Sequence, residues 1–421
     1  MQILWGLGGM AAVLLLAFAL STNRRAIKPR TVFVALAIQF AFGFIVLYSQ
    51  IGQRALEAVS SVVGAVINSS SEGISFLFGP VIPEEGSVFA FQVLPVIIFF
   101  ASLTAVLYHW NILQWVVRII GGALQKALGT SRAESMNATA NIFVGQTEAP
   151  LVIRPYVARM TRSELFAVMV GGLSTVAGSV LVGYSLLGAP LEYLIAASFM
   201  AAPGALLMAK IVMPETDTPV EDIAAEGTNG DERETEGDAA PETASPGLTG
   251  HRNVIDAAAA GASDGLRLAL NVGAMLIAFI SLIALLNLIL GSAGGLFGFP
   301  DLTFEAILGY IFAPVMLAIG VPWEEAIRAG SFLGQKLILN EFVAFSNFGP
   351  QIGEFSDKTA AIITFALTGF ANFSSLAILL GGLGGIAPER RPDIASMGIR
   401  AVLAGTLANL MSATIAGMLI G

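Results

Sequence analysis

The stretch NIFVGQTEAP, residues 141–150, places Gln146, Thr147 and Glu148 side by side between Gly145 and Pro150. The 421-residue chain around it is 55% hydrophobic and 12% charged, and its mean hydropathy is +0.78. A soluble domain cannot bury that much apolar surface, so the composition predicts an integral membrane protein. A carboxylate at membrane depth is costly and normally has a functional partner, so this stretch marks a candidate binding site.

The apolar segments around this stretch predict an all-α, multi-pass membrane protein. Eight of them are long enough to cross a hydrocarbon core of ~30 Å: 3–21, 31–50, 91–110, 164–190, 191–212, 266–291, 359–384 and 397–420. Residues 131–157 and 323–350 are apolar but are interrupted by Gly, Pro and charged residues. We interpret both as re-entrant hairpins, which are tolerated at membrane depth when they are buried in protein or line a cavity. Residues 111–128 read as an amphipathic, interfacial helix.

Charged residues set the predicted orientation. If both termini lie outside, the predicted cytoplasmic loops hold most Lys and Arg residues, as the positive-inside rule requires. The net charge of −9 reflects one segment, because eleven acidic residues and one basic residue lie between Glu215 and Glu242. We expect residues 213–255 to form a disordered, acidic, cytoplasmic linker. The chain has no Cys and two His, which excludes disulfides and leaves little for a zinc site.

The two halves of the chain resemble each other. GLSTVAGSVL, from Gly172, and GFANFSSLAI, from Gly369, share a pattern of Gly, apolar, small and polar residues. We expect each pattern to break an otherwise apolar helix, at about 164–190 in the first half and about 359–384 in the second. Each follows a hairpin that carries a carboxylate, Glu148 in the first half and Glu341 in the second. The predicted topology inserts the hairpins from opposite sides. The pattern therefore predicts inverted repeats, which in secondary transporters meet around the substrate near the membrane midplane.

The polar residues of the hairpins and breaks suggest a neutral ligand. Glu148 and Glu341 combine with amides and hydroxyls into an acceptor-rich site, which suits a polyol attached to a heterocycle better than an anion. Phe370 could contact a ring face, or it could pack in the core or against lipid. The alternative for each Glu is a structural cap bonded to hairpin-tip amides. Lys336 is the obvious candidate for an ion pair with Glu341.

A coupling ion is suggested by the first break. Asn141 and Thr175 supply side-chain oxygens, and the breaks free the carbonyls of Val144 and Val176. Such neutral oxygen ligands suit Na⁺. Hydrogen bonding between packed helices is the alternative for Asn141 and Thr175, and proton coupling through Glu148 or Glu341 is the alternative to Na⁺.

Four ordered motifs are similar to those of the concentrative nucleoside transporters. They are GQTEAPLVIRPY, GLSTVAGSVLVGY, NEFVAF and the long segment that begins GFANFSSLAILLGG, and the resemblance runs from about residue 80 to the C-terminus. It implies a homotrimer in the inner (plasma) membrane, in contact with lipid and without nucleic acid, that imports nucleosides with a cation, most often Na⁺. It also implies an elevator-like mechanism in which a transport domain carrying both hairpins moves against a scaffold.

The resemblance assigns roles to individual residues. It implies nucleobase contacts for Gln146, Thr147 and Glu148, with Val180 as an apolar neighbour of the base. Ribose contacts fall on Glu341, Asn372 and Ser375, and Phe370 lies against the nucleoside. The implied Na⁺ ligands are Asn141, Val144, Thr175 and Val176, with Thr175 standing where some members have Ser.

The expected domain division follows the resemblance. Residues 1–110 and 256–320 are expected to form the scaffold, and 111–212 and 321–421 the two transport-domain repeats, with the linker between them. Proton coupling and a nucleoside receptor that does not transport remain as alternatives. An intramembrane hydrolase would need a nucleophile with a base or a metal, and neither His109 nor His251 is near the hairpins in sequence, so we expect no enzyme.

Overall fold

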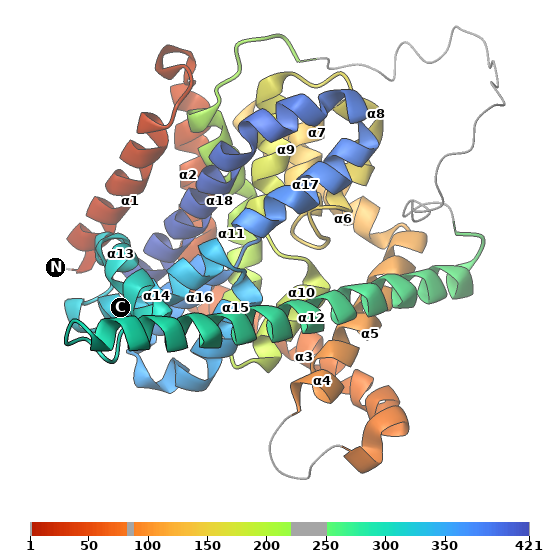
Figure 1. Cartoon of the computed structure of the whole chain (residues 1–421). Helices are drawn as coiled ribbons and strands as arrows, with labels where there is room; N and C mark the ends of the chain where they lie inside the picture. The colour runs from red at the N-terminus through yellow and green to blue at the C-terminus, as the bar shows by residue number, and fades with distance from the viewer. Residues whose placement is uncertain (1, 82–87, 220–250, 421) are drawn as a thin grey trace, which may run out of the picture.

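The computed structural model describes residues 2–81, 88–219 and 251–420, and these residues form an all-helical protein without strands (Figure 1). Most of the predicted acidic linker, residues 220–250, lies outside the described residues. The helices of the first half are α1 (Gln2–Ala19), α2 (Pro29–Gly43), α3 (Gln50–Phe78), α4 (Phe89–Gln92), α5 (Leu94–His109), α6 (Ile112–Leu128), α7 (Arg132–Ala140), α8 (Arg154–Val157), α9 (Arg162–Ser174), α10 (Gly178–Leu186) and α11 (Leu191–Val212). Those of the second half are α12 (Val254–Gly295), α13 (Phe304–Ala318), α14 (Trp323–Ile338), α15 (Glu341–Phe348), α16 (Asp357–Leu367), α17 (Phe373–Ile386) and α18 (Arg391–Ile420).

Six helical stretches of the described chain are long and apolar enough to cross a membrane. They are 29–48, 89–109, 162–186, 191–212, 254–295 and 388–420, and a seventh results if α13 and α14, which meet at 116°, count as one. The first and seventh of the eight predicted spans differ from these. Residues 3–19 form a shorter apolar helix, and residues 359–384, predicted as a broken helix, form α16 and α17, which are not counted among these six stretches. The predicted amphipathic helix at 111–128 is present as α6.

The same order of elements occurs twice in the described chain. A helical hairpin, an interrupted helix and a long helix follow one another as α7–α8, α9–α10 and α11, and again as α14–α15, α16–α17 and α18. We call α7 to α8 hairpin 1 and α14 to α15 hairpin 2. In Figure 1 the chain runs downward from α9 to α10 and upward from α16 to α17, so the interrupted helices run in opposite directions.

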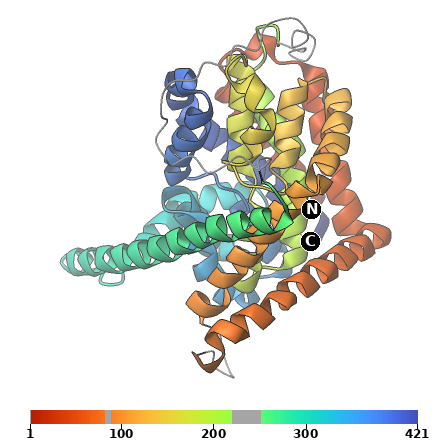
Figure 2. The same cartoon turned by 90° about the vertical axis from the view of Figure 1, so that its right-hand side faces the viewer.

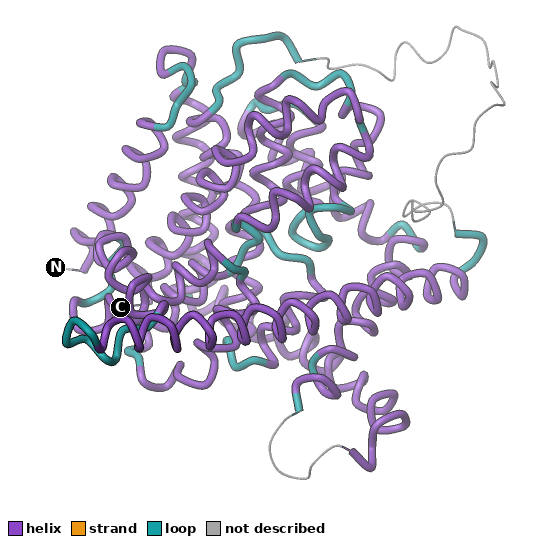
Figure 3. Tube along the Cα trace, in the orientation of Figure 1, coloured by secondary structure: helices purple, strands orange, loops and turns teal. Residues whose placement is uncertain are grey.

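The backbone leaves the helical conformation at both interruptions. Thr175, after the end of α9, adopts an extended conformation with φ −110° and ψ 174°. At the second break Gly369 has φ +153°, a conformation that favours glycine. Asn372 then caps α17 by accepting a hydrogen bond from the Ser375 amide at 2.8 Å, the role for which Asn is among the preferred residues. The two breaks, which we call break 1 (175–177) and break 2 (368–372), are loop segments enclosed by helices (Figure 3).

The long helices divide between a buried core and an exposed pair. Helices α9, α11, α16 and α18 pack against one another, with α1 against α18 and α2 against α11. By contrast, α5 and α12 pack mainly on each other, where Gly261 and Gly265 allow close approach because a Cβ on either would lie 2.8 Å or less from α5 atoms. Helix α12 has 42 residues and extends well beyond the bundle (Figure 2).

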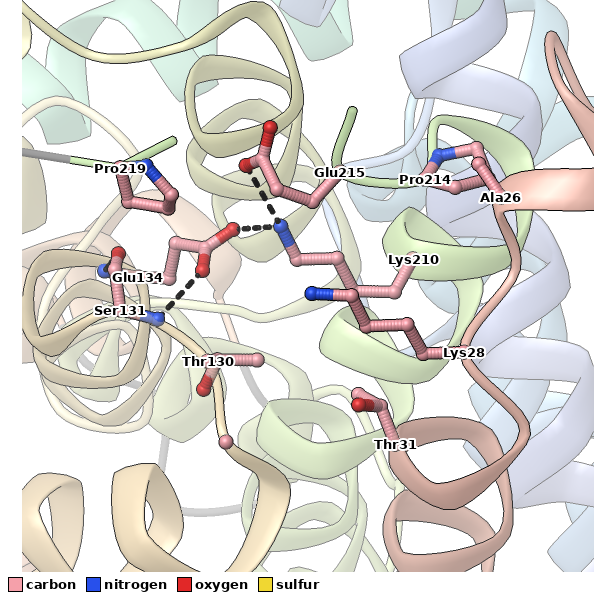
Figure 4. Close-up of a pocket in the computed structure, with 11 residues that line it drawn as sticks. Ala26, Lys28, Thr31, Thr130, Ser131, Glu134, Lys210, Pro214, Glu215 and Pro219 are labelled. Carbon is pink, nitrogen blue, oxygen red and sulfur yellow. Dashed lines mark hydrogen bonds and ion pairs between the residues drawn. The ribbon is translucent and has the colours of Figure 1, made fainter. Parts of the chain in front are cut away.

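An ion-pair cluster fastens the base of hairpin 1 to α11. Glu134 and Ser131 form a capping box at the start of α7, and Glu134 also pairs with Lys210 in the last turn of α11 (Figure 4). The Lys210 Nζ donates to Ser163 Oγ at 2.9 Å and lies 3.7 Å from Glu215 Oε2. Since both Lys210 and Glu134 are buried, the cluster holds the two ends of the first repeat together.

We expect Lys210→Met to destabilise the protein markedly, because it leaves the buried Glu134 carboxylate without its cation. Removing one partner of a buried pair costs about 3–5 kcal/mol. A thermal melt of the detergent-solubilised protein measures the loss. Lys28→Met is the matched control, since Lys28 lines the same pocket but forms no ion pair among the described residues. The double variant Lys210→Met with Glu134→Gln should recover most of the stability, and failure to do so would contradict the assignment.

Candidate functional site

The two breaks touch each other and the loop of hairpin 1. The Phe370 amide donates to the Thr175 carbonyl at 3.2 Å, which joins break 2 to break 1. The Gly178 amide donates to the Phe143 carbonyl at 3.1 Å, which joins the loop at 141–148 to the start of α10. Residues far apart in the sequence therefore meet at one place inside the bundle, where the backbone lacks its regular helical partners.

Hairpin 2 presents a carboxylate held by two donors. Glu341 Oε2 accepts from Asn372 Nδ2 at 2.8 Å, and Oε1 accepts from the Tyr184 hydroxyl at 3.0 Å. Asn372 Oδ1 in turn accepts from Ser374 Oγ at 2.7 Å and from the Ser375 amide. Three of the predicted residues, Glu341, Asn372 and Ser375, are therefore together, and all are buried. Each carboxylate oxygen keeps a lone pair that can accept from a ligand hydroxyl.

Sequence reasoning missed Tyr184. Its ring stacks on Phe345 with centroids 4.4 Å apart and meets Phe342 edge-on at 4.9 Å. These contacts anchor the first interrupted helix to hairpin 2, and the hydroxyl orients Glu341. Val180 lies one turn before Tyr184 on α10, on the same face of the helix, and is buried. The signal for Tyr184 was available, because a buried Tyr needs a partner for its hydroxyl, but the partner lies 157 residues away.

The predicted residues of hairpin 1 lie next to α9 and α17. Gln146 is buried against α9, since a Cβ on Gly172 would lie 2.8 Å from its Cβ, and its Oε1 has no hydrogen-bond partner. Thr147 packs on α17, where a Cβ on Gly382 would lie 2.9 Å from its Cγ2. The Glu148 carboxylate folds back over Gly145, so a side chain at position 145 would require the carboxylate to move.

Buried oxygens without donors gather near break 1. Asn141, fully buried at the end of α7, uses its Nδ2 to donate to the Asn137 carbonyl at 2.9 Å, while its Oδ1 accepts from no donor in the described parts of the chain. Thr175 donates its hydroxyl to Gly171 O at 2.8 Å, which leaves the Oγ1 lone pairs free. Val144 and Val176 are buried in the same segments. An orphaned buried acceptor is costly, and a small cation with oxygen ligands would satisfy it.

A cavity of about 160 Å³ separates hairpin 1 from the α5–α12 pair. Two predicted residues, Val144 and Glu148, line it on one side. Thr104 of α5 and Asp264 of α12 line the other side, and Asp264 interacts electrostatically with Glu148. Sequence reasoning also missed Asp264, because only the packing of α12 brings that carboxylate to the hairpin.

The structure contradicts one predicted contact. Lys336 forms no ion pair with Glu341; its Nζ instead donates to the Ala366 carbonyl and to Asn409. The reason is that Lys336 faces α16 and α18, whereas the Glu341 carboxylate turns toward α10 and α17. Phe370, at break 2, is partly exposed, which leaves its ring accessible.

Comparison with protein families covers almost the whole chain. Residues 8–81 match the model of the Na⁺ dependent nucleoside transporter N-terminus, and residues 193–417 match that of the C-terminus. Residues 90–191, which include hairpin 1 and break 1, match a model described as nucleoside recognition.

Similar proteins include transporters of bacteria and mammals. An uncharacterized transporter of Bacillus subtilis, YutK, is 58% identical over the full length of both chains. The nucleoside permease NupC of Helicobacter pylori is 47% identical over 99% of this chain and 98% of its own. Sodium/nucleoside cotransporter 1 of Rattus norvegicus is 38% identical over 98% of this chain and 63% of its own.

The fold is similar to that of solved structures in different states. The transporter CNTnw in an inward-facing, substrate-bound state is 52% identical, with a TM-score of 0.91 over 100% of this chain and 98% of the other. A doubly substituted form of CNTnw in an outward-facing state gives a TM-score of 0.93 over 100% and 99% of the two chains, at 52% identity.

Proposed function

Because this chain belongs to the Na⁺-dependent nucleoside transporter family, we propose that it imports nucleosides across the plasma membrane by symport with Na⁺. One observation carries the proposal. Buried acceptors without protein donors, Asn141 Oδ1 and Gln146 Oε1, lie beside the point where two oppositely directed interrupted helices meet. Unfilled acceptors at such a junction are what a cation and a hydrogen-bonding substrate would satisfy together.

The substrate lies between the hairpins in this proposal. Hairpin 1 takes the base, through Gln146, Thr147 and Glu148, with Val180 as an apolar neighbour. Hairpin 2 and break 2 take the ribose through Glu341, Asn372 and Ser375, and the accessible ring of Phe370 packs on the nucleoside. The Glu341 network supports the ribose assignment, since both carboxylate oxygens are already oriented and each can accept one more hydroxyl.

The coupling ion is assigned to break 1. Asn141 and Thr175 contribute side-chain oxygens and Val144 and Val176 contribute carbonyls, a neutral set that suits Na⁺. The Asn141 Oδ1 has no donor among the described residues and is therefore available to an ion, as is the Oδ1 of Asn137 one turn earlier.

An elevator movement is the proposed mechanism. The packing supports a scaffold centred on α5 and α12, which bind mainly each other, and a mobile body that contains both re-entrant hairpins and both interrupted helices. Helices α1 and α2 pack on α18 and α11, so we place them with the mobile body, which moves the boundary drawn from the sequence at residue 110. The cavity between Glu148 and Asp264 then lies at the sliding interface.

We also propose that three copies assemble. Helices α12 and α3 expose many apolar side chains, and α12 projects beyond the bundle, so its surface is available to a neighbouring copy as well as to lipid (Figure 2). The mass of the detergent-solubilised protein, after the mass of the bound detergent is subtracted, distinguishes a trimer from a monomer.

Proteoliposomes with separately imposed gradients test the function. We expect an inward Na⁺ gradient to drive accumulation of radiolabelled uridine or adenosine, and replacement of Na⁺ by choline to abolish it. A pH gradient alone should drive none; accumulation driven by protons would identify the proton-coupled alternative. Nucleoside binding without accumulation under any gradient would identify a receptor and would overturn the proposal.

A further inference from the structure

Lys336 is a buried cation that the proposed binding sites do not use. It lies near the end of α14 in hairpin 2, and its side chain is 0% exposed. Burying an ammonium is unfavourable unless its charge is compensated and its hydrogens are bonded. In the described part of the chain no carboxylate lies within ion-pair distance of Nζ, although Glu341 interacts with it at longer range.

Oxygens at break 2 compensate the ammonium. The Nζ donates to the Ala366 carbonyl at 2.7 Å and to Asn409 Oδ1 at 2.8 Å. Ala366 is in the last turn of α16, and its carbonyl is free because the Phe370 amide, four residues on, donates to Thr175 instead. Carbonyls at the C-terminal end of a helix carry the negative end of its dipole, so they attract a cation.

Asn409 extends this contact to the other interrupted helix. Its Nδ2 donates to the Thr368 carbonyl at 2.8 Å and to the Ser174 carbonyl at 2.7 Å. Ser174 ends α9, and its carbonyl is also free, because the Gly178 amide donates to Phe143. The Lys336 ammonium and the Asn409 amide therefore donate hydrogen bonds to carbonyls at the C-terminal ends of both α9 and α16.

The two breaks differ in the groups that satisfy their oxygen atoms. Among the described residues, the acceptor Asn141 Oδ1 near break 1 has no protein donor, and no Lys or Arg lines the neighbouring cavity. At break 2 the Ala366 and Thr368 carbonyls accept from side-chain donors, and a lysine side chain supplies the positive charge. The two repeats share their order of elements, so both must compensate the carbonyl groups that an interrupted helix leaves unbonded, and they do so in different ways.

We infer that Lys336 is a tethered cation, which does at break 2 what an exchangeable Na⁺ does at break 1. Its ammonium holds the C-terminal end of α16 in place. It thereby positions two residues that contact the ribose in the proposed site: Asn372, at the start of α17, and Glu341, five residues after Lys336 in hairpin 2. Only break 1 then takes an ion from solution. The inference rests on the proposed function and adds that one Na⁺ enters with each nucleoside.

The coupling ratio of the wild-type protein tests the inference without a variant. In proteoliposomes with fixed nucleoside and Na⁺ gradients, the membrane potential at which net nucleoside flux vanishes gives the number of Na⁺ ions per nucleoside. We expect one. A ratio of two would overturn the tethered-cation inference while leaving Na⁺ symport intact, whereas the absence of Na⁺-driven flux would overturn the proposed function itself.

The variant Lys336→Ala tests directly whether nucleoside binding needs a cation at this position. At saturating Na⁺ we expect nucleoside binding to weaken by about tenfold or more, because an interaction with a charged group is lost. Added propylammonium, which fits the vacated space, should restore most of the affinity, and tetramethylammonium, which cannot donate hydrogen bonds, should not. Lys358→Ala, on α16 and partly exposed, is the matched control and should bind like wild type.

A purely structural role predicts a different pattern. Lys336→Ala would then lose affinity in a way that neither amine restores, and that result would overturn the inference, as would wild-type affinity in the variant. If the Ala variant does not fold, Lys336→Arg keeps the charge and should retain a coupling ratio of one. A second Na⁺ in that variant or in wild type contradicts the inference.

Discussion

We expect Glu341→Gln to reduce nucleoside uptake about 100-fold or more, because hydrogen bonds to a charged group contribute about 1.5–3 kcal/mol each. In the variant one ribose hydroxyl would lose its acceptor, and the other would bond a neutral oxygen in place of a charged one. The amide also conflicts with the existing network. Asn372 Nδ2 and the Tyr184 hydroxyl both donate to the carboxylate, so an NH₂ group would face a donor on one side. Asn372 cannot turn to accept, because its Oδ1 is bound by Ser374 and Ser375.

Initial uptake of radiolabelled uridine at subsaturating concentration, normalised to reconstituted protein, measures this loss. Glu354→Gln is a matched control, since Glu354 pairs with Arg328 at an exposed position of the same half. Tyr184→Phe removes one of the two donors and keeps the ring stacking, so its effect should be smaller, about tenfold. Normal uptake by a well-inserted Glu341→Gln protein would exclude Glu341 from the ribose site.

The second large effect is expected for Asn141→Ala, which removes an oxygen from the proposed Na⁺ site. We expect the Na⁺ concentration for half-maximal uptake to rise about tenfold or more, because an oxygen that is buried without a donor is replaced by a methyl group. Thr175 and the carbonyls of Val144 and Val176 remain. Uptake should therefore be restored by high Na⁺ rather than abolished.

Uptake measured against Na⁺ concentration, at fixed nucleoside and constant ionic strength, checks this expectation. Asn68→Ala, at an exposed position of α3, is the control and should keep the wild-type Na⁺ dependence. If Asn141→Ala lowers the maximal rate without shifting the Na⁺ dependence, Asn141 serves helix packing and the ion binds elsewhere.

The sequence by itself determined the class of protein and the plan of its repeats. Apolar run lengths, and the Gly and polar residues that interrupt them, are local properties, so they located both hairpins and both interrupted helices to within a few residues. The predicted broken helix at about 359–384 is divided by Gly369 and Asn372. Asn372 was recognisable because an Asn within an apolar helix suggests a new helix start.

Only the tertiary structure decided which polar groups satisfy one another. Lys336 and Glu341 are five residues apart and of opposite charge, so an ion pair was the natural expectation, yet the partner of Lys336 is Asn409, 73 residues away. Tyr184 and Asp264 entered the site for the same reason, through the packing of α10 on hairpin 2 and of α12 near hairpin 1. Periodicity shows which residues must be buried, whereas the partner of a buried donor or acceptor depends on how distant helices meet.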